Sequence, residues 1–218
     1  MKKILGLALA AFVLMALVAG GTWAYFSDTE VSGTNTITAG KLNLKVNNEA
    51  AFTITLNARK PGHNGNAATW LVNNDGDLNG DLSVTLSAIT NNENTRLAME
   101  TAAGDGSDVG GELGSLLKMA FWMDVDKSGG WTSGDYYLKS DGSKVSHSGG
   151  GPALPSAAYD ILDNYDLDAF ANCQTGVAPG DLGNFRVEYD FPDAGNNTDN
   201  KAQTDDVQFT ITFDLKAS

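Results

Sequence analysis

The chain has 218 residues and an acidic composition, with 27 Asp and Glu against 14 Lys and Arg and a net charge of −13. So negative a surface repels nucleic acid and anionic membrane faces, so we expect neither as a partner. Cys173 is the only cysteine, which excludes a disulfide within the chain and predicts a buried, unreactive thiol.

The first 24 residues have the layout of a secretory signal peptide. A short basic start precedes residues 4–21, which carry no charged side chain. Small residues then predict that a signal peptidase cleaves between Ala24 and Tyr25. A membrane anchor is the alternative, because an uncharged run of this length reaches the lower limit for a membrane span. We expect cleavage, and therefore a secreted protein in the extracellular space or at the cell surface.

The next segment, residues 25–38, can form a strand but carries few apolar residues to hold it in place. Burying each of them supplies about 1.5–3 kcal/mol, whereas ordering each residue costs about 1–2 kcal/mol. The segment therefore needs a preformed sheet edge, which can belong to its own domain or to a neighbour. The residues that define this candidate donor strand are Tyr25, Phe26, Val31, Gly33, Asn35 and Ile37.

From residue 39 to residue 218, apolar and polar residues alternate in several segments, as in half-buried strands. One-sided burial of this kind predicts antiparallel rather than parallel sheets. With no internal repeat and no long linker, we predict one mainly β domain, a jelly-roll-like antiparallel β-sandwich. The alternating residues are Leu42, Leu44 and Val46; Phe52, Ile54 and Leu56; Leu82, Val84, Leu86 and Ala88; Phe185, Val187 and Tyr189; and Val207, Phe209, Ile211, Phe213 and Leu215.

Short helical decorations are expected on this sandwich. The clearest helix runs from Ser156 to about Tyr165, within an insertion near residues 155–170. Its apolar side chains fall on one helical face, and Pro155 stands just before it, where proline favours a helix start.

The stretch DVDKSGGWTSGD has the spacing of an EF-hand-type calcium loop, in which alternate oxygen ligands converge and a glycine permits the sharp turn at Gly129. The last ligand position holds Asp instead of the usual Glu, and the flanks, residues 119–123 and 136–138, favour strands rather than helices. An acidic hairpin turn that binds no ion is the alternative. The candidate calcium ligands are Asp124, Asp126, Ser128, Thr132 and Asp135.

Other polar and aromatic residues favour structural roles. Two further acidic groups are expected to be solvated turns, with cation binding as the lesser alternative. Three tryptophans are expected to pack in the core rather than to stack on sugars, and one sequon at Asn196 is relevant only in a host that glycosylates. The residues are Asp75, Asp77 and Asp81; Asp163, Asp166 and Asp168; and Trp70, Trp122 and Trp131.

Three stretches resemble TasA/camelysin-type proteins. They are GTWAYFSDTE followed by NTITAGKLNLKV at the N-terminus, ARKPGHNGNAATWLVNNDGDLNGDLSV at residues 58–84, and DDVQFTITFDL at residues 205–215. The resemblance implies export with a SipW-type signal peptide and assembly into extracellular fibres. In such fibres the freed N-terminal segment, here residues 25–37, completes the sandwich of the next subunit. This is β-strand addition through a head-to-tail interface that does not close, which yields a filament.

The resemblance also raises an enzyme alternative, because camelysin-type relatives have been classed as metalloendopeptidases. Catalytic zinc needs about three protein ligands and an open position. The two histidines, His63 and His147, lie in no H-E-x-x-H motif, so we expect neither zinc nor catalytic residues. We predict a non-enzymatic subunit of a filament, pilus or biofilm matrix, with copies of itself and an anchor or accessory fibre protein as partners. A monomeric domain for cell-surface binding or adhesion is the other alternative.

Overall fold

The structure is a computed structural model, and most of the chain after residue 39 can be described. The described residues are 40–46, 51–57, 60–106, 110–165, 169–180, 182–195 and 197–218. The predicted signal peptide, its cleavage site and the candidate donor strand lie outside them, as do Asp166, Asp168 and Asn196. Gly40–Ser218 forms the unit described below.

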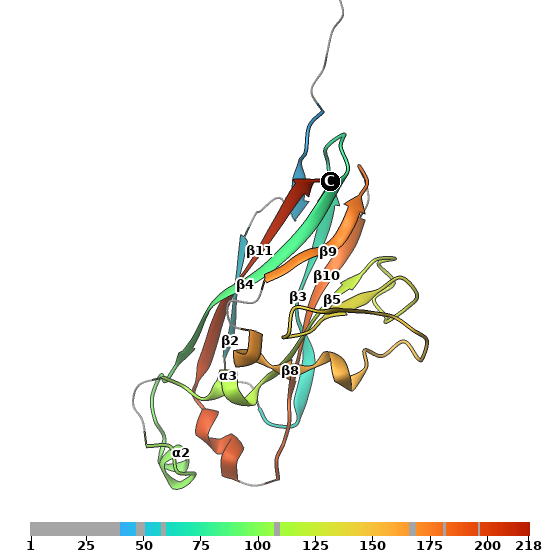
Figure 1. Ribbon diagram of the computed structural model, residues 1–218. Helices are drawn as coiled ribbons and strands as arrows, with labels where there is room; N and C mark the ends of the chain where they lie inside the picture. Colours follow the sequence, from blue (N-terminus) through green and yellow to red (C-terminus); the bar gives the residue numbers. More distant parts are fainter. Residues whose placement is uncertain are drawn as a thin grey trace, which may run out of the picture. The chain divides into compact units, whose positions relative to one another are not determined.

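Two antiparallel sheets make up this unit, as the alternating sequence predicts (Figure 1). The larger sheet has the order β1 (Leu44–Val46), β3 (His63–Asn74), β10 (Leu182–Phe191), β5 (Lys118–Asp124), β6 (Tyr136–Leu138) and β7 (Lys144–Ser146), with β8 (Asp160–Ile161) paired to β5. The smaller sheet has the order β2 (Ala51–Asn57), β11 (Asp206–Ala217), β4 (Gly80–Asn92) and β9 (Ala169–Val177).

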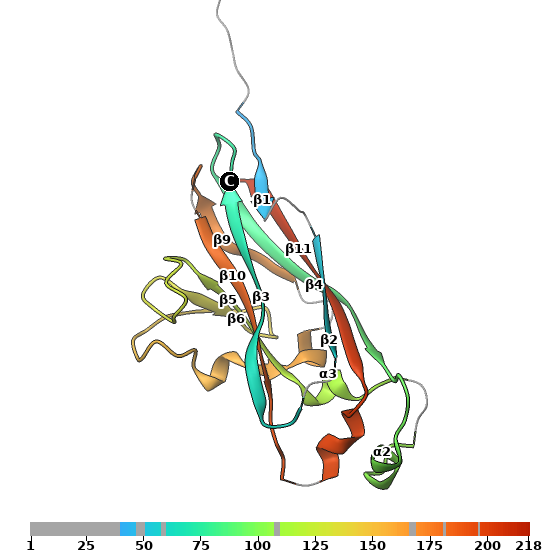
Figure 2. The same cartoon turned by 180° about the vertical axis from the view of Figure 1, so that it is seen from behind.

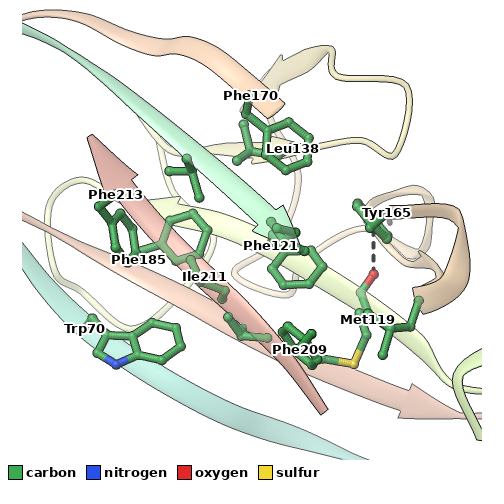
Figure 3. Packing of buried hydrophobic residues seen from close by; sticks show 14 of the residues in the cluster. Trp70, Met119, Phe121, Leu138, Tyr165, Phe170, Phe185, Phe209, Ile211 and Phe213 are labelled. Atoms are coloured by element: carbon green, nitrogen blue, oxygen red, sulfur yellow. Dashed lines mark hydrogen bonds between the residues drawn. The ribbon is translucent and has the colours of Figure 1, made fainter. Parts of the chain in front are cut away.

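The main core lies between the two sheets. In β11, buried residues alternate with more exposed ones along most of the strand, which confirms the predicted period of two. The Phe213 ring of β11 lies 5.1 Å from the Phe185 ring of β10, and Phe209 lies 6.0 Å from Phe121 of β5. These edge-to-face pairs join the two sheets, as Figure 3 shows.

Strand β5 differs from the other strands because all but its first residue are buried. Its inward side chains join the main core, where Tyr165 packs on the ring of Phe121 at 4.9 Å (Figure 3). Its outward side chains, including Trp122, form a second apolar cluster with Trp131 and Tyr137. A strand covered on both faces has no reason to alternate, which explains its continuous apolar sequence.

The helix predicted from Ser156 to Tyr165 is wrong. The segment instead forms two 3-10 turns, Ser156–Ala158 (η1) and Leu162–Tyr165 (η2), with β8 between them. The amide of Leu162 donates to the carbonyl of Leu117 at 3.0 Å. Pairing with β5 and with Leu117 just before it thus replaces the hydrogen bonds that a local helix would make.

The helical segments that do form are short. They are α2 (Ala98–Ala102), α3 (Leu113–Leu116) and the 3-10 segment η3 (Asn197–Ala202), besides η1 and η2. Within the described ranges, no helix has the length and apolar character that a membrane span requires.

Candidate functional site

The described domain begins with a segment held against the turn between β3 and β4. The amide of Asp75 donates to the carbonyl of Asn43 at 2.7 Å, and the Asp75 carboxylate pairs with Lys45 at 2.7 Å. A Cβ atom on Gly76 would lie 2.3 Å from the carbonyl oxygen of Lys41, so only glycine allows this approach. The chain before β1 is therefore fixed in position and direction.

Strand β3 has a long edge with little pairing. On one side it pairs with β10 from His63 to Asn73, but on the other it pairs with β1 only at Val72–Asn74. No other described strand lies beside residues 63–69 on that side. Figure 2 shows β1 at one end of β3. Among the described strands, residues 63–69 thus form an open sheet edge, which can accept a further strand.

The chain enters β1 from the end of β3 that is far from this open edge. The two strands are antiparallel, with Leu44 opposite Asn74 and Val46 opposite Val72. Residues 41–43 therefore continue past Asn74 toward the β3–β4 turn, in the direction away from residues 63–69. The segment before β1 and the open edge at residues 63–69 therefore lie at opposite ends of β3.

A second candidate site is the hairpin loop, residues 124–135, which joins β5 to β6. As the sequence spacing predicts, the structure brings the carboxylates of Asp124, Asp126 and Asp135 together, with one oxygen of each within 4.8 Å of the others. Gly129 has φ +79°, a left-handed conformation that suits the turn. Asp124 and Asp135 are fully buried, whereas Asp126 is exposed.

The hairpin loop supplies hydrogen-bond donors to its own carboxylates. The two oxygens of Asp124 accept from the amides of Ser128 and Gly129, both at 3.0 Å. Those of Asp135 accept from the amides of Val125 and Thr132 at 2.8 and 2.7 Å.

Asp126, in the same loop, accepts from the Ser128 amide at 3.0 Å and the Thr132 hydroxyl at 2.9 Å. Hydrogen bonds from Ser128 and Thr132 hold the pKa of Asp126 at about 2, whereas burial raises the pKa of Asp124. Arg186 adds a positive charge 3.6 Å from Asp124. Ser128 was also predicted as a ligand. Its hydroxyl donates to the carbonyl of Gly130 at 3.2 Å.

The other acidic turns have protein partners. Asp77 accepts a hydrogen bond from the amide of Lys41, Asp81 accepts from the amide of Gly176 at 2.8 Å, and Asp163 accepts from the side chain of Asn91 at 3.1 Å. In the described part of the chain, none of these aspartates belongs to a group of three candidate metal ligands.

Among the described residues, neither histidine belongs to a group of three candidate metal ligands, although the amide of His147 donates to the carbonyl of Asp135 at 2.7 Å. His63 is exposed at the start of β3, and the ring of His147 packs edge-on against Trp131 at 5.3 Å. Cys173 is buried, as predicted, and burial raises its pKa to about 11.

The predicted core positions of the tryptophans are confirmed. Trp70, Trp122 and Trp131 keep only 7%, 1% and 5% of their surface exposed. So little accessible ring surface offers a sugar no stacking platform.

Sequence reasoning missed a further acidic group, which we name the end cluster. Its members are Glu93, Glu100, Asp105, Glu112 and Asp205. They are spread over more than a hundred positions and follow no known ligand spacing. The signal that could have found them is strand register, because Asn92 of β4 pairs with Asp206 of β11 and so sets Glu93 beside Asp205.

Comparison with known proteins decides the family. The whole chain, residues 1–218, matches the family described as camelysin metallo-endopeptidase. The chain belongs to the camelysin family. The TasA/camelysin resemblance is thereby confirmed. No curated protein matches the chain. The family description names a peptidase, which favours an enzyme over the predicted non-enzymatic subunit.

A catalytic zinc ion fits the described residues of this camelysin-family chain poorly. Catalytic zinc sites combine histidine or cysteine ligands with at most one carboxylate and keep an open position for water. In the described part of the chain, every group of three candidate ligands consists of carboxylates alone. Oxygen-only sets of this kind suit hard cations such as Ca²⁺ rather than zinc.

Proposed function

We propose that this camelysin-family protein is a secreted structural subunit of an extracellular filament, pilus or biofilm matrix. Each subunit would donate residues 25–38 as a strand to the sandwich of the next. The observation that supports this function is the open edge of β3 at residues 63–69, which offers main-chain hydrogen bonds to an added strand.

The direction of the chain favours donation to a neighbour over insertion into the same domain. The segment before β1 is fixed to the β3–β4 turn through Asn43 and Asp75, and it points away from residues 63–69. To reach its own edge, the donor strand would have to reverse and run back over roughly 20 Å, the length of seven strand residues. A second subunit can present its edge without any reversal.

Donation in this direction gives a head-to-tail interface. One subunit contributes its N-terminal segment and the other contributes β3, so the two surfaces differ and the contact repeats without closing. Cleavage after Ala24 by a signal peptidase would release the donor strand only after export. An anchor or accessory fibre protein would then begin or end the polymer.

Cysteine cross-linking tests this function. Asn35→Cys in the donor strand and Thr69→Cys at the exposed edge of β3 are combined in a Cys173→Ser background, and partner positions 33 and 37 cover the neighbouring registers. After mild oxidation, we expect a ladder of disulfide-linked oligomers on a non-reducing gel. We also expect a covalent dimer when the two single-cysteine proteins are mixed, because the pairing is between subunits.

The same experiment has clear negative outcomes. A cross-linked monomer in the double variant, without dimer from the mixture, would show that the strand folds into its own domain. The matched control is Asp141→Cys in place of Thr69→Cys. Asp141 is exposed in the turn between β6 and β7, on the opposite side of the larger sheet from β3, and this variant should give no ladder. Deletion of residues 25–38 should abolish fibres seen by electron microscopy.

We also propose that the hairpin loop binds Ca²⁺, which the convergence of Asp124, Asp126 and Asp135 supports. The ion would take carboxylate oxygens that now accept hydrogen bonds from the loop itself, so its affinity would be weak. Extracellular calcium modules bind in the range of about 10⁻⁴–10⁻³ M.

A peptidase is the second candidate function, and the family description favours it. The test is hydrolysis of casein by the purified protein with and without a chelator. Activity that a chelator abolishes and that disappears in the His63→Ala/His147→Ala variant would support the enzyme. Cleavage that persists in this variant would come from a contaminant or from other residues.

A further inference from the structure

The end cluster lies where two central strands of the smaller sheet leave their ladder. Strand β4 ends at Asn92 and β11 begins at Asp206, and these two residues are paired. Glu93 and Asp205 therefore emerge side by side. Helix α2 and the segments that flank it and α3 bring three more carboxylates to the same place, namely Glu100, Asp105 and Glu112.

The carboxylates of the end cluster form two overlapping groups, each small enough to hold one ion. Glu93, Glu100 and Asp205 each place an oxygen within 4.8 Å of the others, and Glu93 also forms such a group with Asp105 and Glu112. Oxygens on opposite sides of a Ca²⁺ ion lie at most about 5.2 Å apart, since each Ca–O distance is 2.3–2.6 Å. Glu93 belongs to both groups and is their common member.

Burial makes this accumulation of negative charge costly. Glu100 and Asp205 are fully buried, and Asp105 is 4% exposed. Moving an ionised carboxylate out of water without compensation costs several kcal/mol, and like charges at this separation add to the cost. Buried charges in proteins are therefore paired or coordinate metals.

The protein supplies only part of this compensation. Among the described residues, neither oxygen of Glu93 nor Oδ1 of Asp205 has a hydrogen-bond donor, and neither residue forms an ion pair. Both oxygens of the adjacent Asp206 do have donors, from the side chains of Asn92 and Asn94 at 2.8 and 2.7 Å. Among the described residues, buried carboxylate oxygens without a donor therefore occur only in the end cluster.

Hydrogen bonds from the backbone and from Thr204 already fix other parts of the end cluster. The Asp205 Oδ2 atom accepts from the amide of Glu112 at 2.6 Å, and Glu100 accepts from the amide and hydroxyl of Thr204, both at 3.1 Å. A Cβ atom on Gly111 would lie 2.7 Å from the Asp205 carboxylate. The carboxylates are held in place before any ion arrives.

We propose that the end cluster is a Ca²⁺-binding site, with Glu93, Glu100 and Asp205 as ligands and with Asp105 and Glu112 beside them. An oxygen-only set with several carboxylates suits Ca²⁺, which takes six to eight oxygen ligands in flexible geometry. The ion replaces the missing donors and neutralises the buried charge. It also ties the ends of β4 and β11 to α2 and α3. This site is separate from the hairpin loop and from the proposed filament contact.

The test separates the end cluster from the hairpin loop. The full chain carrying Asp124→Asn and Asp126→Asn is stripped with EGTA, and CaCl₂ is then added in a thermal unfolding assay. At about 100 times Kd, binding to the end cluster should raise Tm by roughly 5–10 °C. Equilibrium dialysis with radioactive calcium counts the bound ions independently of stability.

Two further variants in the same background make the assignment. Glu93→Gln with Asp205→Asn keeps the shapes of the side chains but should abolish both the rise in Tm and the bound calcium. Asp206→Asn, at the next position, should retain both, because the oxygens of Asp206 already have donors. The proposal is overturned if calcium neither binds nor raises Tm in the Asp124→Asn/Asp126→Asn background. Stabilisation of that variant by lower pH alone would not rescue it. It is also overturned if the response survives in the Glu93→Gln/Asp205→Asn variant.

Discussion

The hairpin loop and the end cluster both bring carboxylates together, but they differ in how the negative charge is compensated. In the hairpin loop, every oxygen of Asp124, Asp126 and Asp135 accepts a hydrogen bond from the loop itself, and Arg186 lies close by. In the end cluster, Glu93 and one oxygen of Asp205 have no donor among the described residues.

This difference shows that ligand spacing and the need for an ion are separate properties. The hairpin loop has the spacing of a calcium loop, yet it is a satisfied turn without an ion. The end cluster has no recognisable spacing, yet its buried oxygens lack partners. A motif indicates where ligands can converge, and unsatisfied buried atoms indicate where a ligand is needed.

The same substitution at one aspartate in each region should have opposite effects on calcium-free protein. In the wild-type protein, the backbone amides of Val125 and Thr132 donate to the two oxygens of Asp135. Asp135→Asn replaces one of these oxygens with an NH₂ group, which cannot accept. It should lower the free energy of unfolding by about 2–3 kcal/mol. Asp205→Asn removes a buried charge and keeps an acceptor for the Glu112 amide, so it should be neutral or stabilising. Urea unfolding in EGTA measures both.

The exposed Asp141→Asn substitution is the control for a general effect of charge, and we expect a change below about 0.5 kcal/mol. If Asp205→Asn destabilised calcium-free protein as much as Asp135→Asn does, the end cluster would be a satisfied structural network. The contrast between the two regions would then be wrong.

Glu93 of the end cluster and Asp126 of the hairpin loop should also respond to pH in different ranges. Burial raises the pKa of Glu93 to about 7 from its usual 4.5. The folded, calcium-free protein therefore binds more protons than the unfolded chain between these values, and its stability falls as pH rises through them. Hydrogen bonds lower the pKa of Asp126 to about 2, so the contribution of Asp126 is lost only as pH falls from about 3.8 through 2.

Chemical unfolding in EGTA at pH 5 and pH 8 measures this difference. We expect a loss of roughly 1–3 kcal/mol at the higher pH. Glu93→Gln should remove most of this loss, and Asp126→Asn should leave it unchanged. Equal stability of the wild-type protein at both pH values would show that Glu93 is not protonated in the folded state.

Much of the sandwich could be predicted from the sequence because one-sided burial imposes a period of two. The alternating residues of β4, β10 and β11 identify these strands correctly. Strand β9 (Ala169–Val177) was missed, since its sequence AFANCQTGV contains polar and small residues with no regular alternation. Ser156–Tyr165 was assigned to a helix because its local pattern is helical, whereas pairing of β8 with β5 decides its structure.

The candidate sites divide in the same way. The hairpin loop is local, so the spacing of Asp124, Asp126 and Asp135 was enough to predict that they meet. The end cluster depends on the register between β4 and β11, which brings Glu93 and Asp205 together from distant parts of the chain. No local pattern encodes that register.

The smallest expected effect is that of calcium on the hairpin loop, and it sharpens the comparison most. In a Glu93→Gln/Asp205→Asn background, calcium at about five times Kd should raise Tm by roughly 2–4 °C. Asp124→Ala with Asp126→Ala should remove this rise, because it deletes two of the three converging carboxylates. Thermal unfolding in EGTA and in CaCl₂ gives both values.

Terbium luminescence provides an independent measurement, since Trp131 lies within the loop and can sensitise a bound lanthanide ion. Excitation of tryptophan should give a terbium signal that calcium displaces and that Trp131→Phe weakens. If calcium instead stabilised the hairpin loop more than the end cluster, hydrogen bonds from the loop amides would be no obstacle to the ion. The presence of donors would then be a poor guide to which acidic group requires a cation.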